Sequence, residues 1–320
     1  MADQWTEVSV NGEFRKVPAL FIDGLTIMIT GRRLKTAVIK DEWWLEADAV
    51  GDPARLLEPL KKDRRGADLF VFSQKPPDTE PRYKFPMVRS NVAAIPITTY
   101  EDWWETRLTQ VTRKNVRRSQ RRGVVVKKVE FDDPLVEAIV RINNSTPVKQ
   151  QRRNVHYGKS FDAVKKDYTD FGGRSDYWGA FYKEEMIGLL RMIYQGPIGN
   201  IMQLFCMPQH NDKRPANVLL AAAVEQCVKS GLSYLLYGQY IYGRNAKAPL
   251  TEFKRRNGFE QFLVPTYYIP LTVKGRMAIM LNMHRGIQFF VPQKMMDWAF
   301  AFRNWKLGRQ NRKTRQDDSE

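Results

Sequence analysis

Cysteine and histidine are both scarce in this sequence. The two cysteines, Cys206 and Cys227, do not form a CxxC pair, so neither a disulfide framework nor a cysteine zinc site is predicted. The three histidines, at positions 156, 210 and 284, show no H-x-x-x-H or HExxH spacing, and we therefore expect no metal ion. A chain of this kind fits a reducing cytoplasm.

Long apolar runs are missing as well. No stretch reaches the roughly 18 residues that a membrane-spanning helix needs. The first residues, MADQWTEVSV, lack the basic and apolar regions of a secretion signal. No G-x-S-x-G motif is present and neither cysteine lies in a known nucleophile signature, so we do not expect a covalent acyl-enzyme.

Positive charge, by contrast, is in excess. Lysine and arginine number 52 against 35 aspartates and glutamates, which gives a formal net charge of +17. This balance favours an anionic partner: nucleic acid, an acidic membrane surface or a phosphorylated small molecule. The charge alone does not choose among the three.

The first part of the chain has the pattern of a small α/β lobe. Residues 17–46 contain β-rich runs separated by Asp23-Gly24 and Gly31, which are typical of short hairpins. A helix is predicted to begin at Pro53, and the strands ADLFVFS and NVAAIPI follow it. We assign residues 1–95 to this lobe.

The next segment, TTYEDWWETRLTQVTRKNVRRSQRRG, predicts a basic helix that ends at Gly123 before a strand. Trp104, Leu108 and Val111 are expected on its apolar face. The cations on its flank are Arg113, Lys114, Arg117, Arg118, Arg121 and Arg122. They form either a solvated face that suits the negative end of the helix dipole or a cradle for phosphate groups.

The second half of the sequence has a definite element order. From about residue 176 to residue 271 the predicted elements are strand, strand, strand, helix, strand, helix and strand. The first two strands are expected to turn at Glu184-Glu185. The helix that follows the third strand is expected to begin at Pro215 and to end at Gly231.

Three segments resemble the Fem-like aminoacyl and acyl transferases, a branch of the GNAT superfamily. They are TRKNVRRSQRRGVVV, KRPANVLLAAAVEQCVKSGLSYLLYGQ and YGRNAKAPLTEFKRRNGFEQFLVPTYYIPL. The resemblance implies an α+β fold in which residues 96–274 form a GNAT-like mixed sheet flanked by helices. The first 95 residues would then be a smaller, reduced GNAT-like lobe.

The resemblance also implies a catalytic lysine. The Phe-Lys pair of Fem-like enzymes corresponds here to Phe253 and Lys254, whose cation would stabilise the negative charge that develops during acyl transfer. The alternative is that Lys254 belongs to a solvent-facing helix end. Glu225 and Glu252 are candidate bases. A base or proton relay is expected just after the strand SYLLYG, from Tyr237, Gln239, Tyr240 and Tyr242.

A second element of the predicted site is the helix start at Pro215. Free backbone N–H groups there suit the pyrophosphate of coenzyme A or an RNA phosphate. The residues expected to bind the donor are Lys213, Arg214, Ala216 and Asn217, and further substrate contacts are expected from Arg117, Arg121 and Arg244. The loop lacks the glycines of the usual GNAT pattern, so an ordinary helix capped by Asn211 or Asp212 is the alternative.

Residues 275–320 are expected to form amphipathic helices followed by a disordered basic tail. Trp298, Phe302 and Trp305 share one helical face with basic neighbours, which is typical of an interfacial helix and equally of core packing. If the first interpretation holds, this segment contacts an anionic membrane at its inner face.

Our leading hypothesis is an acyltransferase. It would move an acyl group from acyl-CoA, an anionic co-substrate that is not permanently bound, to an amine of a cell-envelope or polysaccharide precursor. One alternative uses aminoacyl-tRNA as the donor. Another is a nucleic-acid-binding protein without catalysis, which would explain the charge and leave the Fem-like segments unexplained.

Overall fold

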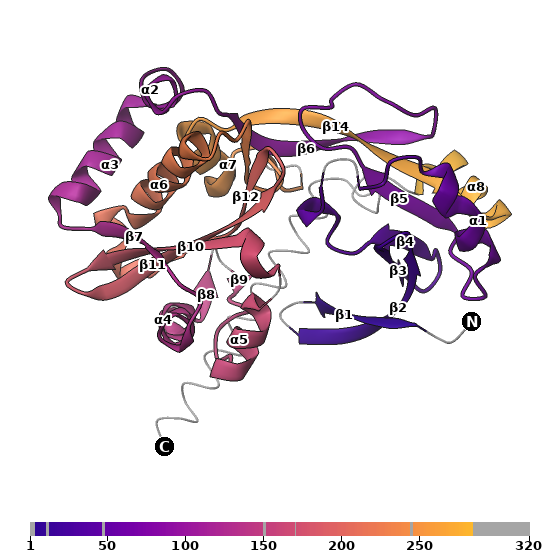
Figure 1. Ribbon diagram of the computed structural model, residues 1–320, viewed down its shortest axis with the longest axis horizontal. Helices are drawn as coiled ribbons and strands as arrows, with labels where there is room; N and C mark the ends of the chain where they lie inside the picture. The colour runs from indigo at the N-terminus through magenta and orange to yellow at the C-terminus, as the bar shows by residue number, and fades with distance from the viewer. Residues whose placement is uncertain are drawn as a thin grey trace.

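The structure is a computed structural model, and it describes residues 4–10, 13–46, 49–149, 152–169, 171–243 and 246–283. A mixed sheet of twelve strands extends through the whole of this part (Figure 1). Its strands are β1 (Trp5–Val10), β2 (Glu13–Ile22), β3 (Leu25–Thr30), β4 (Thr36–Ile39), β5 (Leu69–Ser73), β6 (Met87–Pro96), β7 (Val125–Val129), β10 (Ser175–Tyr182), β11 (Glu185–Gln195), β12 (Ile198–Cys206), β13 (Tyr234–Leu236) and β14 (Glu260–Pro270).

Helices connect and cover these strands. The α-helices are α1 (Ala54–Lys62), α2 (Tyr100–Asp102), α3 (Gln110–Arg121), α4 (Asp133–Asn144), α5 (Phe161–Tyr168), α6 (Pro215–Lys229), α7 (Pro249–Arg256) and α8 (Val273–Met280). Four short helices are η1 (Glu42–Trp44), the π-helix η2 (Trp103–Arg107), η3 (Gly172–Arg174) and η4 (Pro208–Lys213). A separate small ladder joins β8 (Val148–Lys149) and β9 (Arg152–Arg153). In the described part of the chain no helix is long and apolar enough to cross a bilayer.

The sheet consists of two halves with the same topology. In the first, β2 to β5 lie in order, and α1 connects β4 to its parallel neighbour β5. In the second, β10 to β13 lie in order, and α6 connects β12 to its parallel neighbour β13. The element order predicted for the second half is confirmed, as is the α+β class.

Each half contributes one strand to the other. The strand that follows β5 is β6, which pairs with β13, and the strand that follows β13 is β14, which pairs with β5. The two exchanged strands then pair with each other, from Met87 and Tyr267 to Ala94 and Glu260. The predicted division near residue 95 falls at the end of β6, and the division into domains stays a prediction.

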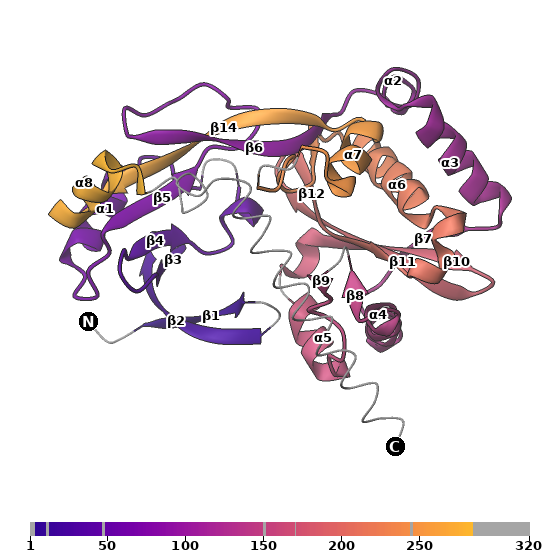
Figure 2. The same cartoon turned by 180° about the vertical axis from the view of Figure 1, so that it is seen from behind.

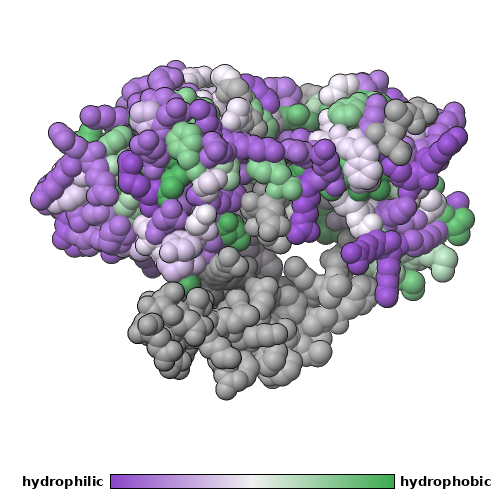
Figure 3. Space-filling view, turned by 90° about the horizontal axis from the view of Figure 1, so that it is seen from below, coloured by the Kyte–Doolittle hydropathy of each residue, from purple (hydrophilic) through white to green (hydrophobic). Residues whose placement is uncertain are grey.

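Helices lie on both faces of the second half. Figures 1 and 2 show α3 and α6 on one face and α4 and α5 on the other. The apolar side of α6 packs against β10, β11 and β12 in the main core, whereas α4 packs against β11. The first half has its own core beneath α1, which contributes the fully buried Leu56 and Leu60. Seen from below, the described surface is mainly hydrophilic with scattered hydrophobic residues (Figure 3).

The basic helix is shorter than the sequence suggested. The backbone leaves the helical region at Leu108 and Thr109, and the Thr109 hydroxyl then accepts a hydrogen bond from the N–H of Thr112 to cap α3. The buried residues of α3 are Thr112, Val116 and Ser119. The predicted apolar face assumed one continuous helix through this break. It is therefore wrong at Val111, which is 54% exposed.

Three further details differ from the sequence-based expectation. The turn between β10 and β11 uses Lys183 and Glu184, both with positive φ, so it lies one residue before the predicted turn. Strand β1 was not predicted. At the start of α6 the cap position is held by Arg214 in the left-handed region, and neither Asn211 nor Asp212 caps the helix.

Replacement of Tyr267 by alanine should destabilise the whole sheet. Its side chain is fully buried on β14, where it stacks on Phe72 at a centroid distance of 5.1 Å. We expect Tyr267→Ala to lower the free energy of unfolding by about 3–5 kcal/mol in a urea titration followed by tryptophan fluorescence. Leu263→Ala, on the same strand but 41% exposed, should cost less than about 1 kcal/mol. Because β14 belongs to both halves, two separate transitions would contradict this interpretation.

Candidate active site

Lys254 of α7 is enclosed completely by the protein. Its side chain is 0% exposed, and its Nζ donates hydrogen bonds to the carbonyl oxygens of Tyr237 and Gln239 at 2.5 Å each. The same nitrogen lies 4.5 Å from the centre of the Tyr237 ring and 4.9 Å from that of Tyr242. Two carbonyl dipoles and two aromatic faces therefore replace the water that this amine would otherwise bind.

The protonation of Lys254 is finely balanced. Burial lowers the pKa of Lys254 to about 7, because removal from water disfavours the charged form. Hydrogen bonds to two carbonyl oxygens favour the ammonium and act in the opposite direction. An ammonium has three N–H donors, and the described residues occupy two of them with carbonyl oxygens. The rings of Tyr237 and Tyr242 also face this nitrogen, and the Lys254 side chain itself lines neither of the two cavities described below.

A cavity of about 740 Å³ adjoins the segment that Lys254 holds. Its wall is formed by residues 41–44 around η1, by the middle of β6, by Asn200 of β12 and by Gly238, Gln239 and Tyr242 after β13. We call it the interlobe cavity, because both halves of the sheet contribute to it. Of the predicted catalytic residues, Gln239 lines this cavity and Tyr237 contacts Lys254 behind it.

A second cavity, of about 300 Å³, lies on the other side of α7 at the start of α6. Among the predicted site residues it brings together Arg214, Asn217 and Phe253. Arg214 has a φ of 57° there, a left-handed conformation that is uncommon for any residue but glycine. The amide of Asn217 donates a hydrogen bond to Oδ1 of Asn257 at 3.1 Å. We call this the α6 cavity.

The remaining predicted residues lie elsewhere. Lys213 is turned away from the α6 cavity, with its Nζ 4.7 Å from the centre of the Tyr182 ring. Ala216 lies on α6 outside the cavity wall. Arg117 and Arg121 are on the exposed face of α3, where Arg117 lies over the ring of Trp104 at 5.5 Å. Arg244 lies outside the described residues, as do the predicted tail helices beyond residue 283.

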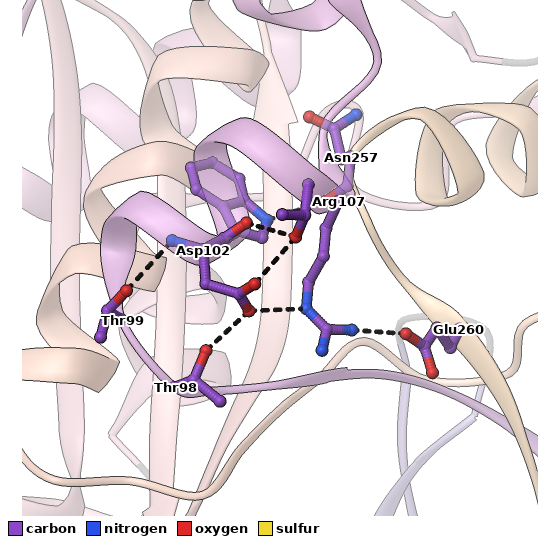
Figure 4. A network of polar contacts seen from close by, with 8 residues as sticks. Thr98, Thr99, Asp102, Arg107, Asn257 and Glu260 are labelled. Atoms are coloured by element: carbon purple, nitrogen blue, oxygen red, sulfur yellow. Dashed lines mark hydrogen bonds and ion pairs between the residues drawn. The ribbon is translucent and has the colours of Figure 1, made fainter.

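A polar network fixes the end of α7 against the segment before α3. The carboxylate of Asp102 accepts hydrogen bonds from the Thr98 hydroxyl at 2.7 Å and from Nε of Arg107 at 3.3 Å (Figure 4). Arg107 is also paired with Glu260 at the start of β14. The indole N–H of Trp103 donates to the carbonyl oxygen of Asn257 at 3.1 Å. Asn257, in the wall of the α6 cavity, is thus held to η2.

None of the predicted bases has the electrostatics of a base near neutral pH. Hydrogen bonds from Arg255 and then Arg256 hold the pKa of Glu252 at about 2. Glu225 is exposed and paired with Lys229. Burial raises the pKa of Tyr237 and of Tyr240, so both phenols stay protonated.

The carboxylate best suited to the role is Glu42, which sequence reasoning missed. It lies on η1 in the wall of the interlobe cavity. Its position depends on contacts between residues far apart in the chain, and the only local signal was the placement of two acids before Trp43 and Trp44.

Solved structures with the same architecture exist. FemX superimposes with a TM-score of 0.56 over 83% of this chain and 88% of FemX, at 10% identity. The fold of this chain is therefore similar to that of FemX. L-PGS from Bacillus licheniformis has a TM-score of 0.53 at 12% identity, over 84% of this chain and 88% of that one. The C-terminal domain of a lysylphosphatidylglycerol synthetase assigned in Agrobacterium fabrum has a TM-score of 0.54 at 12% identity. The match covers 82% of this chain and 87% of that domain.

These likenesses are structural, and they confirm the fold that the sequence resemblance implied. No protein-family model matches the sequence, and no curated protein sequence matches it either. In this chain, α7 is placed so that Lys254 holds the segment after β13, which lines the interlobe cavity, while Phe253 beside it lines the α6 cavity.

Replacement of Lys254 by methionine should lower stability, and the deficit should depend on pH. Loss of two hydrogen bonds to buried carbonyls should cost about 1–3 kcal/mol in a denaturant titration. The folded-state pKa is depressed, so between pH 7 and about 10 the unfolded chain binds the extra proton and the parent gains stability as pH rises. The gap between parent and Lys254→Met should therefore widen from pH 7 to about pH 9.

Arg255→Met is the matched control for this experiment. It removes a neighbouring cation of α7 whose side chain is 57% exposed, and it should change stability by less than about 0.5 kcal/mol at each pH. A pH-independent gap for Lys254→Met would show that the buried amine keeps its proton.

Proposed function

We propose that the protein is an acyltransferase that moves an acyl group from a thioester donor, such as acyl-CoA, to an amine of a cell-envelope or polysaccharide precursor. The observation that carries the proposal is the enclosed Lys254, which sits in a Fem-like fold beside a cavity large enough for a substrate. The names of the related synthetases denote transfer of an aminoacyl group, which belongs to the same class of chemistry.

Lys254 would act on the charge that develops at the reacting carbonyl. When the amine attacks, the carbonyl oxygen becomes negative, and a donor fixed beforehand in a water-poor site stabilises that charge without reorganisation. The bonds to Tyr237 and Gln239 fix the ammonium in position before any substrate binds. Because the side chain is 0% exposed, its charge would act on that oxygen through the wall formed by Gly238, Gln239 and Tyr242, and electrostatic stabilisation of this kind is worth about 3 kcal/mol in enzyme sites.

The α6 cavity is the proposed binding place for the phosphate part of the donor. Arg214 supplies a cation, the amides of Asn115 and Asn217 supply polar groups, and the start of α6 supplies the positive end of the helix dipole. Glu252 on the same wall is balanced by Arg255 and Arg256, which limits its repulsion of an anion. The phosphate and acyl parts of a donor would then lie on either side of α7.

Aminoacyl-tRNA is the second candidate donor, and α3 favours it. Arg117, Arg118 and Arg121 are exposed there, whereas Arg113 donates to carbonyl oxygens of the preceding turn and Arg122 pairs with Asp212. Three exposed arginines on one helix suit a phosphate backbone better than a single pyrophosphate.

Transfer assays should separate these donors. Release of free thiol from acetyl-CoA and from a long-chain acyl-CoA, each with an amino-sugar acceptor, is measured beside transfer from aminoacyl-tRNA. We expect thiol release, and we expect Lys254→Met to lower kcat/KM by about 10²–10³-fold while Lys62→Met, which removes an exposed cation of α1, stays within about twofold. Equal rates for the folded Lys254→Met variant and the parent would remove Lys254 from the mechanism.

Salt dependence tests the tRNA alternative. If α3 tracks an RNA backbone, the affinity for tRNA should fall steeply with salt, and alanine at positions 117, 118 and 121 should reduce the slope of log K against log salt by about 2–3. Lys229→Ala, which removes an exposed cation of α6 paired with Glu225, is the control and should leave the slope unchanged. A flat titration of the parent would eliminate tRNA as the donor.

A further inference from the structure

The charge of the interlobe cavity is opposite to that of the protein. Asp41 and Glu42 are the only formally charged residues among the described ones in its wall, in a chain with a net charge of +17. An acidic cavity in a basic protein is complementary to a cation and unfavourable for a phosphate. This cavity therefore suits an amine better than it suits the anionic donor.

A buried amide in the same wall lacks a partner. Asn200 is 3% exposed, and its Nδ2 donates to the carbonyl oxygen of Trp43 at 3.2 Å. Its Oδ1 accepts no hydrogen bond from any residue that the structure describes. An unpaired buried oxygen of this kind costs about 1–3 kcal/mol, which a donor group on a ligand would recover.

The turn that carries Glu42 is held from both halves of the sheet. Oε1 of Glu42 accepts the N–H of Ser73 at 2.5 Å. The carbonyl oxygen of Trp43 also accepts the amide of Gln195, and that of Trp44 accepts Nη1 of Arg174 at 3.1 Å. Glu42 is thus fixed by β5 on one side and by the second half on the other, with Oε2 left without a hydrogen bond among the described residues.

We propose that the acceptor amine binds in the interlobe cavity between Glu42 and Asn200, and that Glu42 is the general base of the transfer. This inference rests on the acyl transfer proposed above. The bound ammonium gives one proton to the Glu42 carboxylate, and the amine nitrogen then uses its lone pair to form a C–N bond to the acyl carbon.

The rest of the step balances as follows. The C–S bond of the thioester donor breaks, and the thiolate takes the second proton that the nitrogen loses, which gives an amide and a free thiol. Glu42 releases the first proton to water. The products are therefore an amide, a thiol and one proton for each ammonium and thioester consumed.

The titration of Glu42 fits this role. Burial raises the pKa of Glu42 to about 7, although the Ser73 N–H and the charge of Lys75 partly oppose the rise. A base with a pKa near the working pH is the most effective. The ionisable groups near it are Asp41 on its own turn, Lys75 after β5 and Tyr242 on the opposite wall, with the buried Lys254 behind the Tyr242 ring.

The other residues of the wall indicate the class of acceptor. Trp43, Trp44 and Tyr242 offer aromatic surface, and the same wall contains hydroxyl and amide groups of Ser73, Ser90, Asn91, Gln239 and Thr266. Aromatic rings combined with neutral hydrogen-bonding groups suit a compact molecule rich in hydroxyls. With the two acids they indicate an amino sugar.

A matched pair of sugars tests the binding part of the proposal. The probes are 6-amino-6-deoxyglucose and glucose, which differ by an ammonium in place of a hydroxyl, and binding is followed by the fluorescence of the cavity tryptophans. We expect the parent to bind the amino sugar at least about tenfold more tightly at pH 8, with a smaller preference at pH 6 as Glu42 takes up its proton.

Two acid-to-amide variants complete the test. Glu42→Gln should bind the amino sugar and glucose about equally at both pH values. Glu46→Gln, in the exposed loop just after η1, should retain the preference of the parent for the amino sugar. Glu42→Gln keeps the oxygen that accepts from Ser73, and above pH 7 it should melt higher than the parent because no buried charge remains. Should it fail to fold, Asp41→Asn serves instead and should lower the preference.

The outcomes separate this inference from the proposed function. Equal binding of the two sugars by the parent, or an unchanged preference in Glu42→Gln, overturns the amine site whatever the activity. If transfer occurs, kcat should rise with pH as Glu42 ionises and fall as Lys254 loses its proton. Glu42→Gln should lower kcat by about 10²-fold and abolish the rising limb, and retention of that limb would overturn the role of base. Preference for the amino sugar without transfer from any donor would overturn the proposed function alone.

Discussion

The candidate site depends on the need to satisfy one buried amine. An ammonium removed from water must find oxygen atoms within the protein, and Lys254 finds them in two main-chain carbonyls. This requirement turns the carbonyls of Tyr237 and Gln239, just after β13, toward α7, while the carbonyl of Gly238 between them accepts the N–H of Ala93. Gly238 and Gln239 line the interlobe cavity, so the position of Nζ helps to fix this part of its wall. Because α7 also faces the α6 cavity, both parts of the site share one rigid support.

Local patterns in the sequence predicted the elements well. The order of β10 to β14 followed from alternating apolar runs, and the start of α6 followed from Pro215. Lys254 came from a resemblance to the Fem-like family, and the structure shows why a lysine at this position can be buried. The errors arose where a local pattern was extended too far. The apolar face of the basic helix, for example, was continued through a break that Thr109 caps.

What the sequence did not predict comes from contacts between distant residues. Glu42 and Asn200 are 158 positions apart by their numbering, and they meet only because each half of the sheet contributes one strand to the other. The spacing of apolar residues along the sequence predicts single helices and strands, and it does not predict which distant strands pair. Likewise, Lys213 and Arg214 are equivalent when only their charges are considered. In the structure Arg214, with its left-handed backbone, lines the α6 cavity, whereas Lys213 faces the ring of Tyr182.

The exchanged strands also affect how the chain is made. Ser73 of β5 pairs with Thr266 of β14, and 193 residues separate them. During synthesis, one edge of β5 and one edge of β6 therefore remain unpaired until β14, near the end of the described chain, has left the ribosome. An open strand edge of this kind readily pairs with other chains. The nascent chain is therefore most prone to association between the synthesis of β6 and that of β14, and slower translation of the intervening residues would lengthen this interval.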